Sequence, residues 1–307
     1  MFKEVTVYRV SGLSSAAALG EEISKESFAP CLATQQKSAG WVPPRDEHGS
    51  LVESVGGHWI ARFAIETKPV PGDAVRRKVQ QAVAEIEKTS GRKPGKKELR
   101  DLRDDALLEL LPQAFPRRAE VPVWIDPTAG LLVIGTAAQG KADEIVTSLV
   151  RSVGQGFAIN LLQTKTSPQA AMAAWLADDE GEALPDAFDI GRECELKGSG
   201  DEPAVVKFTR HELATDEVRQ HIAEGKLPTK VAMGWAGRVG FTLTQALQLK
   251  KITLADGVLE GRDKDEDRFD ADVAISTGEL RPLIADLIEA LGGELSAAPG
   301  EESGAEA

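Results

Sequence analysis

The first regular pattern along the chain is an alternation of apolar and polar positions over 5–10 (VTVYRV), which predicts a half-buried strand. The same alternation returns over 57–65 (GHWIARFAI) and predicts a second strand. Between them, the pattern over 13–27 favours a helix. The stretch 40–44 (GWVPP) predicts a loop or a sheet edge, because neither proline can donate a hydrogen bond to a sheet ladder.

The apolar period then changes from two to that of a helix. Two apolar faces follow, at spacings of three and four: Val75, Val79, Ala82, Val83 and Ile86, and then Leu99, Leu102, Ala106 and Leu110. The segment GRKPG at 91–95 interrupts the pattern, and Pro112 ends it. We therefore expect a helical hairpin, which projects because its tip has almost nothing apolar to bury.

Strand and helix patterns follow one another irregularly in the rest of the chain. Two strand candidates, 122–126 and 130–136, are joined by the turn DPTAG, and short strand-like pieces lie within 189–207. Further strand candidates are 231–243, 247–254 and 272–276 (DVAIS). Helix candidates are 141–153, 167–177, 215–225 and 280–291. Runs of strands and helices without a steady βαβ repeat predict an α+β fold with antiparallel sheets.

These elements predict several subdomains. We expect one α+β subdomain from 1–70 plus part of 120–165, and a projecting basic hairpin over 71–118. A C-terminal α+β subdomain follows over 166–294. Residues 295–307 are small, acidic and patternless, which predicts disorder.

Charge is distributed unevenly along the chain. The 307 residues carry 36 Lys+Arg against 49 Asp+Glu, a net charge of −13. Residues 76–103 nevertheless hold ten cations and four acids, so this segment is +6 and the remainder is −19. The ten cations are Arg76, Arg77, Lys78, Lys88, Arg92, Lys93, Lys96, Lys97, Arg100 and Arg103. Such a segment is typical either of a polyanion-binding surface or of a solvated, salt-bridged helical face.

A second group of cations favours the first interpretation. Arg117 and Arg118 follow the hairpin directly, and a further basic set comprises Lys207, Arg210, Lys226, Lys230, Arg238, Lys250 and Lys251. Aromatic residues make up 5% of the chain and do not interleave with these cations, which argues against a base-stacking platform for single strands. Contact with the backbone of duplex DNA, with little sequence readout, fits better.

Two segments offer an enzymatic alternative. Residues 135–141 (GTAAQGK) match the spacing of a phosphate-binding loop, but Ala142 stands where a hydroxyl would bind Mg²⁺, and a plain strand–turn–helix explains the same residues. The acidic run 262–272 could supply metal-binding carboxylates, although a solvated loop before the strand candidate DVAIS is the simpler interpretation.

Other residue types indicate neither a metal site nor a membrane segment. Two distant cysteines (Cys31 and Cys194) and four histidines (His48, His58, His211 and His221) form no metal-binding motif. No apolar run approaches the roughly 20 residues that span a bilayer, and the N-terminus lacks a signal-peptide layout. We expect a cytoplasmic, non-enzymatic protein without cofactor or metal.

Several phrases, in their order and spacing, resemble the recombination-associated RdgC family. They are TVYRV, FAPC at 28–31, GWVPP, LLPQAF at 110–115, VWIDPTAGLL at 123–132, HIAEGKLPTKVAMGW at 221–235 and RFDADVAISTGELRPLIADLIEALGGE at 268–294. The resemblance covers residues 1–294 and leaves only the acidic tail outside it.

The resemblance implies a nucleoid-associated bacterial protein that binds duplex DNA without strong sequence preference. It further implies a ring-shaped homodimer with a basic hole, which restrains RecA-promoted strand exchange and acts in recombination and replication. Phe115 corresponds to one dimer contact, and Arg210 with His211 to the other, although relatives often carry an amide in place of His211. The DNA-binding candidates are Arg76, Arg77, Lys78, Lys88, Arg92, Lys93, Lys96, Lys97, Arg100, Arg117, Arg118, Lys207, Arg210, Lys226 and Lys230.

Two other function classes stay open at this point. One is an enzyme that acts on nucleic acid through Lys141 or the carboxylates of 262–272. The other is a protein-interaction module that binds an acidic partner through the hairpin.

Overall fold

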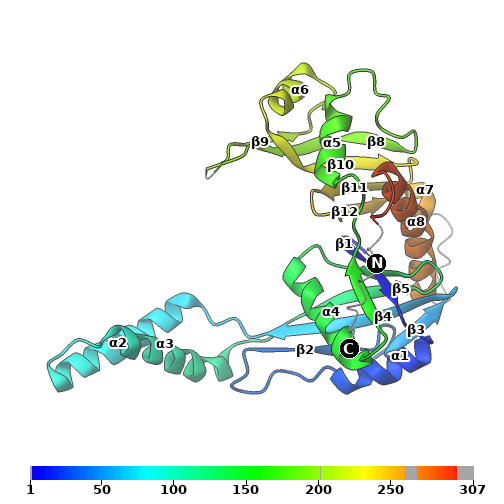
Figure 1. Ribbon diagram of the computed structural model, residues 1–307. Helices are drawn as coiled ribbons and strands as arrows, with labels where there is room; N and C mark the ends of the chain where they lie inside the picture. The colour runs from blue at the N-terminus through cyan, green and yellow to red at the C-terminus, as the bar shows by residue number, and fades with distance from the viewer. Residues whose placement is uncertain (1, 201, 260–267, 296–307) are drawn as a thin grey trace, which may run out of the picture.

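One antiparallel sheet runs through the whole molecule. The computed structural model describes residues 2–200, 202–259 and 268–295, and these form an α+β fold with two lobes and a projecting arm (Figure 1). The strands are β1 Val5–Ser11, β2 Lys37–Val42, β3 Val52–Val55, β4 His58–Thr67, β5 Arg117–Asp126, β6 Leu131–Ile134, β7 Ala158–Leu161, β8 Phe188–Lys197, β9 Val205–Thr209, β10 Leu227–Trp235, β11 Val239–Thr244 and β12 Gln248–Leu254. The helices are α1 Ala16–Ile23, α2 Gly72–Ser90, α3 Lys96–Leu110, α4 Gln139–Val153, α5 Pro168–Ala177, α6 Asp216–Ala223, α7 Asp256–Leu259 and α8 Arg268–Ala290, with 3₁₀ turns η1 Ser24–Glu26 and η2 Leu111–Gln113.

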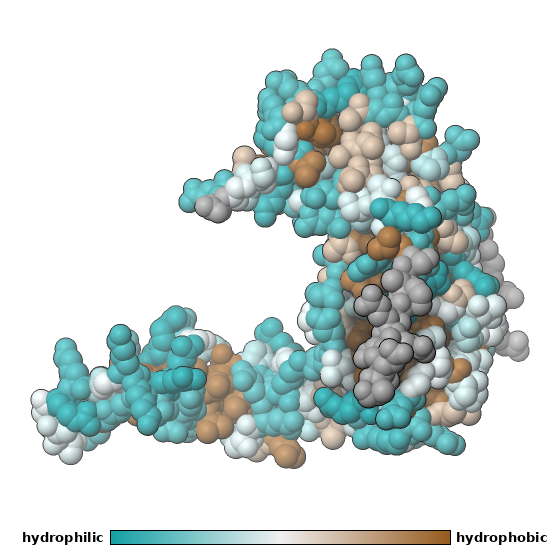
Figure 2. Space-filling model, in the orientation of Figure 1, coloured by the Kyte–Doolittle hydropathy of each residue, from teal (hydrophilic) through white to brown (hydrophobic). Residues whose placement is uncertain are grey.

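The sheet is narrow where the two lobes meet. Its order is β2-β4-β5-β6-β1-β12-β11-β10-β8-β9, with β3 also paired to β4 and β7 to β1. Strands β1 and β12 join the halves through the pairs Val5↔Leu249 and Thr6↔Gln248. The lobes, with the arm, enclose a hollow that opens to one side in the space-filling view (Figures 1 and 2).

Helices cover one face of the sheet in the lobe of β8–β12, and α8 continues from there onto the second face of the lobe of β2–β6, where it contacts β3 and Arg281 pairs with Asp126. In the lobe of β2–β6, α1 and α4 cover a core in which Trp41 meets Phe63 edge-on at 4.9 Å and donates to Ser148 Oγ at 2.9 Å. In the lobe of β8–β12, α5, α6 and α8 pack on one face through residues such as Met172 and Val218. The opposite face of β8–β12 carries polar side chains.

The arm is the helical hairpin that the periodicity predicts. Helices α2 and α3 contact each other, and Gly91 ends α2 with a φ of +69°, a conformation that favours glycine. Among the arm's helical residues, only Val75 and Ala106 are fully buried. Figure 1 shows the arm projecting from the lobe, which confirms the prediction. It projects because α2 and α3 bury little apolar surface outside their contact with each other.

Two predicted strands are wrong. The candidate 231–243 is two strands, β10 and β11, because a tight turn at 236–238 with positive φ at Ala236 and Gly237 reverses the chain inside a continuous apolar pattern. The candidate 272–276 belongs to α8, whose buried positions, among them Val273, Leu280, Ile284 and Leu287, recur at helical spacing.

Other boundaries shift without changing the element. Strand β5 begins at Arg117 rather than near 122, and the pieces over 189–207 are the hairpin β8–β9. The predicted disorder over 296–307 and the acidic residues 262–267 lie outside the described residues. Across the described ranges, no helix combines the length and apolar character needed to cross a membrane.

Candidate nucleic-acid interface

The arm presents its cations to solvent. Three of them lie beside carboxylates: Arg92 Nη1 is 2.8 Å from Glu98 Oε2, Lys78 Nζ is 2.5 Å from Glu109 Oε1, and Arg76 pairs with Asp73. The remaining arm candidates, which have no carboxylate within ion-pair distance in the described part of the chain, are Arg77, Lys88, Lys93, Lys96, Lys97 and Arg100. These exposed pairs contribute little to stability, so the cations remain available to a polyanion.

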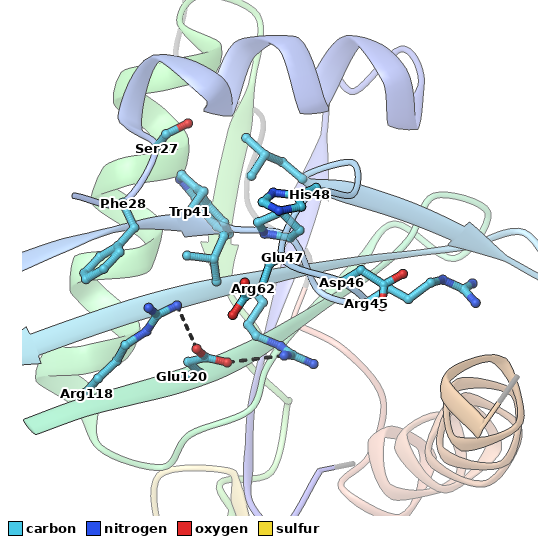
Figure 3. Close-up of a pocket in the computed structure, with 13 residues that line it drawn as sticks. Ser27, Phe28, Trp41, Arg45, Asp46, Glu47, His48, Arg62, Arg118 and Glu120 are labelled. Atoms are coloured by element: carbon cyan, nitrogen blue, oxygen red, sulfur yellow. Dashed lines mark hydrogen bonds and ion pairs between the residues drawn. The ribbon is translucent and has the colours of Figure 1, made fainter. Parts of the chain in front are cut away.

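Arg118 belongs to a charged site where the arm joins the sheet, and the cavity there is lined by three arginines and three acidic residues. Its Nη2 lies 2.9 Å from Glu120 Oε1, and Arg62 Nη1 lies 3.2 Å from the other oxygen of Glu120. Figure 3 shows both guanidinium groups reaching the one carboxylate. The Arg118 guanidinium also stacks 4.6 Å from the centre of the Phe28 ring, on the wall of a cavity of about 630 Å³. Neighbouring Arg117 is exposed at the start of β5.

The arm also exposes apolar side chains. Phe115, between η2 and β5, is 87% exposed, and Leu108 on α3 is 50% exposed. Apolar surface is visible along the arm in Figure 2. Phe115 and Leu108 therefore give the arm exposed apolar surface as well as positive charge.

In the lobe of β8–β12, which we call the upper lobe, side chains alternate between the two faces of the sheet. Cys194, Leu196, Phe208 and Val231 face the helices and are buried. The intervening residues on the opposite face include Glu193, Glu195, Lys207, Lys230, Thr242 and Lys250. They line a cavity of about 340 Å³ together with Lys251.

Glu195 bridges the two predicted lysines of this face. Its neighbours in the sheet are Lys207 on β9 and Lys230 on β10, whose Nζ atoms lie 3.1 and 3.2 Å from its carboxylate oxygens. Thr229 Oγ1 donates to the same carboxylate at 2.7 Å. This hydrogen bond, with the two lysines, lowers the pKa of Glu195 to about 2.

The other upper-lobe candidates lie apart from this cavity. Lys226 is 2.7 Å from Glu224 and 3.0 Å from His221 Nδ1 at the end of α6, so it does not join Lys207 and Lys230. Arg210 follows β9 with a φ of +56°, and its carbonyl accepts a hydrogen bond from Arg192. His211 comes next, with its ring 5.2 Å from that of Phe208.

Three basic residues of these sites were not among the predicted DNA-binding residues. Arg62 occupies a polar position of the alternating strand 57–65, so the alternation was the available signal. Lys250 and Lys251 stand in the basic set of the sequence, but nothing in a regular strand pattern indicates that both line one cavity.

The segment 135–141 is a packing turn in an antiparallel sheet. A Cβ atom at Gly135 would lie 2.6 Å from Pro122 Cγ, so the glycine permits close packing there. Thr136 Oγ1 accepts from Ala138 N at the start of α4, and Ala142 is buried. Strand β6 is antiparallel to both neighbours, which favours the strand–turn–helix interpretation. In the described ranges, no three His, Cys, Asp or Glu side chains gather as a metal site.

Comparison with known proteins extends over nearly the whole chain. The family model described as "Putative exonuclease, RdgC" matches residues 1–294. The chain belongs to the RdgC family. Three RdgC relatives carry the name "Recombination-associated protein RdgC". The one from Cupriavidus necator is 40% identical over 302 residues, covering 96% of this chain and 99% of the relative. The one from Janthinobacterium sp. is 37% identical over 300 residues (96% and 98%), and that from Bordetella pertussis 35% over 299 (95% and 98%).

The RdgC match ends at a residue that fastens the end of the described chain to the sheet. Glu294 accepts hydrogen bonds from the guanidinium of Arg9 on β1, with Nε at 2.8 Å from Oε1. Arg9 Nη1 also donates to the carbonyl of Ala129.

Proposed function

We propose that this RdgC-family protein binds duplex DNA without sequence preference and without catalysing a reaction. We further propose that it closes around the duplex as a ring-shaped homodimer. The single observation that carries the proposal is that basic residues lie both on the arm and on the upper lobe of an overall acidic molecule. The arm (Figure 1) supplies one set, and the face of β8–β12 opposite the helices supplies the other.

The closed ring is supported by what projects from each lobe. The arm, with exposed Phe115 at its base, and the β8–β9 hairpin, followed by Arg210 and His211, extend to the same open side of the molecule (Figure 1). A second copy related by two-fold symmetry would meet both projections, and closed two-fold assemblies are the commonest oligomers. A ring converts weak phosphate contacts into topological retention.

In the cell, we place this protein in the cytoplasm, on the nucleoid. The names of its relatives support a role in recombination. A ring that occupies duplex DNA would restrain RecA-type strand exchange by limiting access to the duplex. We propose that a ring bound to duplex DNA also acts in replication.

The test is the salt dependence of duplex binding. If about six phosphates are neutralised, the plot of log affinity against log salt concentration has a slope near −5. A fluorescence-anisotropy titration of the full chain with a short labelled duplex measures this slope. An affinity that does not change with salt would contradict the proposal.

A nuclease is the second candidate, because the family model is described as an exonuclease. An exonuclease of this kind would need carboxylates that hold a metal, and the described residues gather none. Incubation of labelled linear duplex with the protein and Mg²⁺ or Mn²⁺ separates the two candidates. We expect intact DNA; cleavage that is lost in Lys141→Ala, or on neutralising the 262–272 carboxylates, would establish the enzyme instead.

A competition experiment separates our proposal from the third candidate, a module that binds an acidic protein. Under our proposal, duplex DNA and an acidic polypeptide compete for the arm cations, and the duplex binds more tightly. Tighter binding of the polypeptide would favour the module.

A further inference from the structure

Lys250 and Lys251 are consecutive residues of β12, yet both line the same cavity. Successive side chains of a regular strand point to opposite faces. Here the pairs Gly240↔Thr253 and Thr242↔Lys250 show that β12 holds one more residue than β11 over the same stretch. This bulge places the second lysine on the face of the first, and the buried Leu249 and Ile252 on either side confirm the change of phase.

The bulge holds Lys251 in an uncommon backbone conformation. Its φ of +51° lies in the left-handed region, which suits glycine or asparagine better than lysine. Such conformations persist where the surrounding structure enforces them, and they cluster at binding sites. The backbone strain therefore falls on a residue that lines the cavity.

Positive charge exceeds negative charge in the cavity. Four lysines (207, 230, 250 and 251) face the carboxylates of Glu193 and Glu195, which leaves two positive charges. Lys251 Nζ lies 2.6 Å from Glu193, while Lys250 has no carboxylate within 4.0 Å among the described residues. An ammonium group has three donors, so each paired lysine keeps donors for another acceptor.

The four lysines start from strands spread across the sheet, and three of them turn toward the two carboxylates of β8. They stand on β9, β10 and β12, which are separated by four inter-strand spacings, or about 19 Å. One strand of a duplex presents a phosphate about every 3.4 Å along its axis, so neighbouring phosphates can each meet a different lysine of this face. An extended polyanion complements the row better than one small anion.

We propose that these four lysines, the lysine cavity, bind the phosphodiester backbone of duplex DNA, and that the β12 bulge is the device that directs the Lys250–Lys251 pair at it. Glu193 and Glu195 hold the lysine side chains in place and limit the net charge of the face. The proposal rests on the duplex-binding function and assigns a contact surface to it.

The test compares two charge-neutralised variants of the full chain with a matched control. The variants are K250Q/K251Q and K207Q/K230Q. The control is K25Q/K37Q, which removes two exposed lysines that also pair with carboxylates, Glu22 and Glu144, but lie outside the cavity. Each is titrated with the same labelled duplex over a salt series, after circular dichroism shows that it is folded under the conditions of the titration.

We expect each cavity variant to flatten the salt slope by about 2 and the control to leave it unchanged. K250R/K251R keeps the charge and the wild-type slope, which separates charge from fold. A wild-type slope near −5 that both cavity variants retain would overturn the lysine cavity and leave duplex binding standing. A wild type without salt-dependent duplex binding would overturn both. Loss in the cavity variants of binding to poly-glutamate, with duplex binding intact, would assign the cavity to an acidic protein instead.

Discussion

Lys230 and Glu195 face each other across strands β10 and β8, and the lysine Nζ lies 3.2 Å from the glutamate Oε1. The same carboxylate accepts a hydrogen bond from Thr229 and lies beside Lys207. It is therefore a fixed negative charge at the centre of a basic face. This arrangement links the stability of the upper lobe to the lysines that we propose as phosphate contacts.

Glu195→Gln is expected to destabilise the protein in a pH-dependent way. The folded-state pKa of about 2 lies below the ordinary value of 4.5, so the charged carboxylate contributes stability that is fully present above about pH 4.5. That contribution is lost as the pH falls toward 2. At about 1.4 kcal/mol per pKa unit, the variant loses up to about 3 kcal/mol of unfolding free energy at pH 7.

Urea denaturation at a series of pH values measures the effect. The difference between wild type and variant should shrink as the pH falls from 4.5 toward 2. Glu21→Gln, at an exposed position on α1, serves as the control and should show no such trend. A difference that is constant across this range would contradict the assignment.

Neutralising the tip of the arm is expected to weaken DNA binding. Of the about six phosphates in all, the lysine cavity accounts for about four, so R92Q/K93Q/K96Q/K97Q should remove about two phosphate contacts and flatten the salt slope by about 2. The control D104N/D105N changes exposed acids of the same arm and should not weaken binding. If the tip variant binds like the wild type, the DNA contacts lie at Arg117, Arg118 and the upper lobe instead.

Phe115→Ser is expected to dissociate the dimer without unfolding the protomer. The side chain is exposed in one copy, so its loss should change protomer stability by no more than about 0.5 kcal/mol. A buried aromatic anchor of an interface, in contrast, contributes about 2 kcal/mol or more to association. Sedimentation equilibrium reports the mass, and Val150→Ser, an exposed apolar position on α4, is the control. A variant that sediments as the wild-type dimer would remove Phe115 from the interface.

Local patterns predicted the arm well, because every signal involved is local. Apolar spacing defined both helices, and GRKPG marked the connector between them. The strand candidate 272–276 failed because three apolar residues in a row do not distinguish a strand from part of a helix, and the contacts that decide it, such as those of Val273 in the core, are distant in sequence.

The composition of the upper-lobe site depended on tertiary structure. Lys226 and Lys230 are close in sequence, but only Lys230 lines the cavity, since Lys226 is held by His221 and Glu224. Lys250 and Lys251 share a face only because of the bulge in β12. A charge count finds such lysines, but register decides which of them act together.

The central claim is that two copies of this protein encircle duplex DNA, and the most direct measurement is its release from closed-circular and linear forms of one plasmid. The protein is loaded on each form, challenged with excess unlabelled duplex at raised salt, and the fraction retained is followed in time. A ring leaves linear DNA over the free ends and stays on closed circles, so we predict clearly slower release from the circle. Equal release rates from the two forms would contradict encirclement.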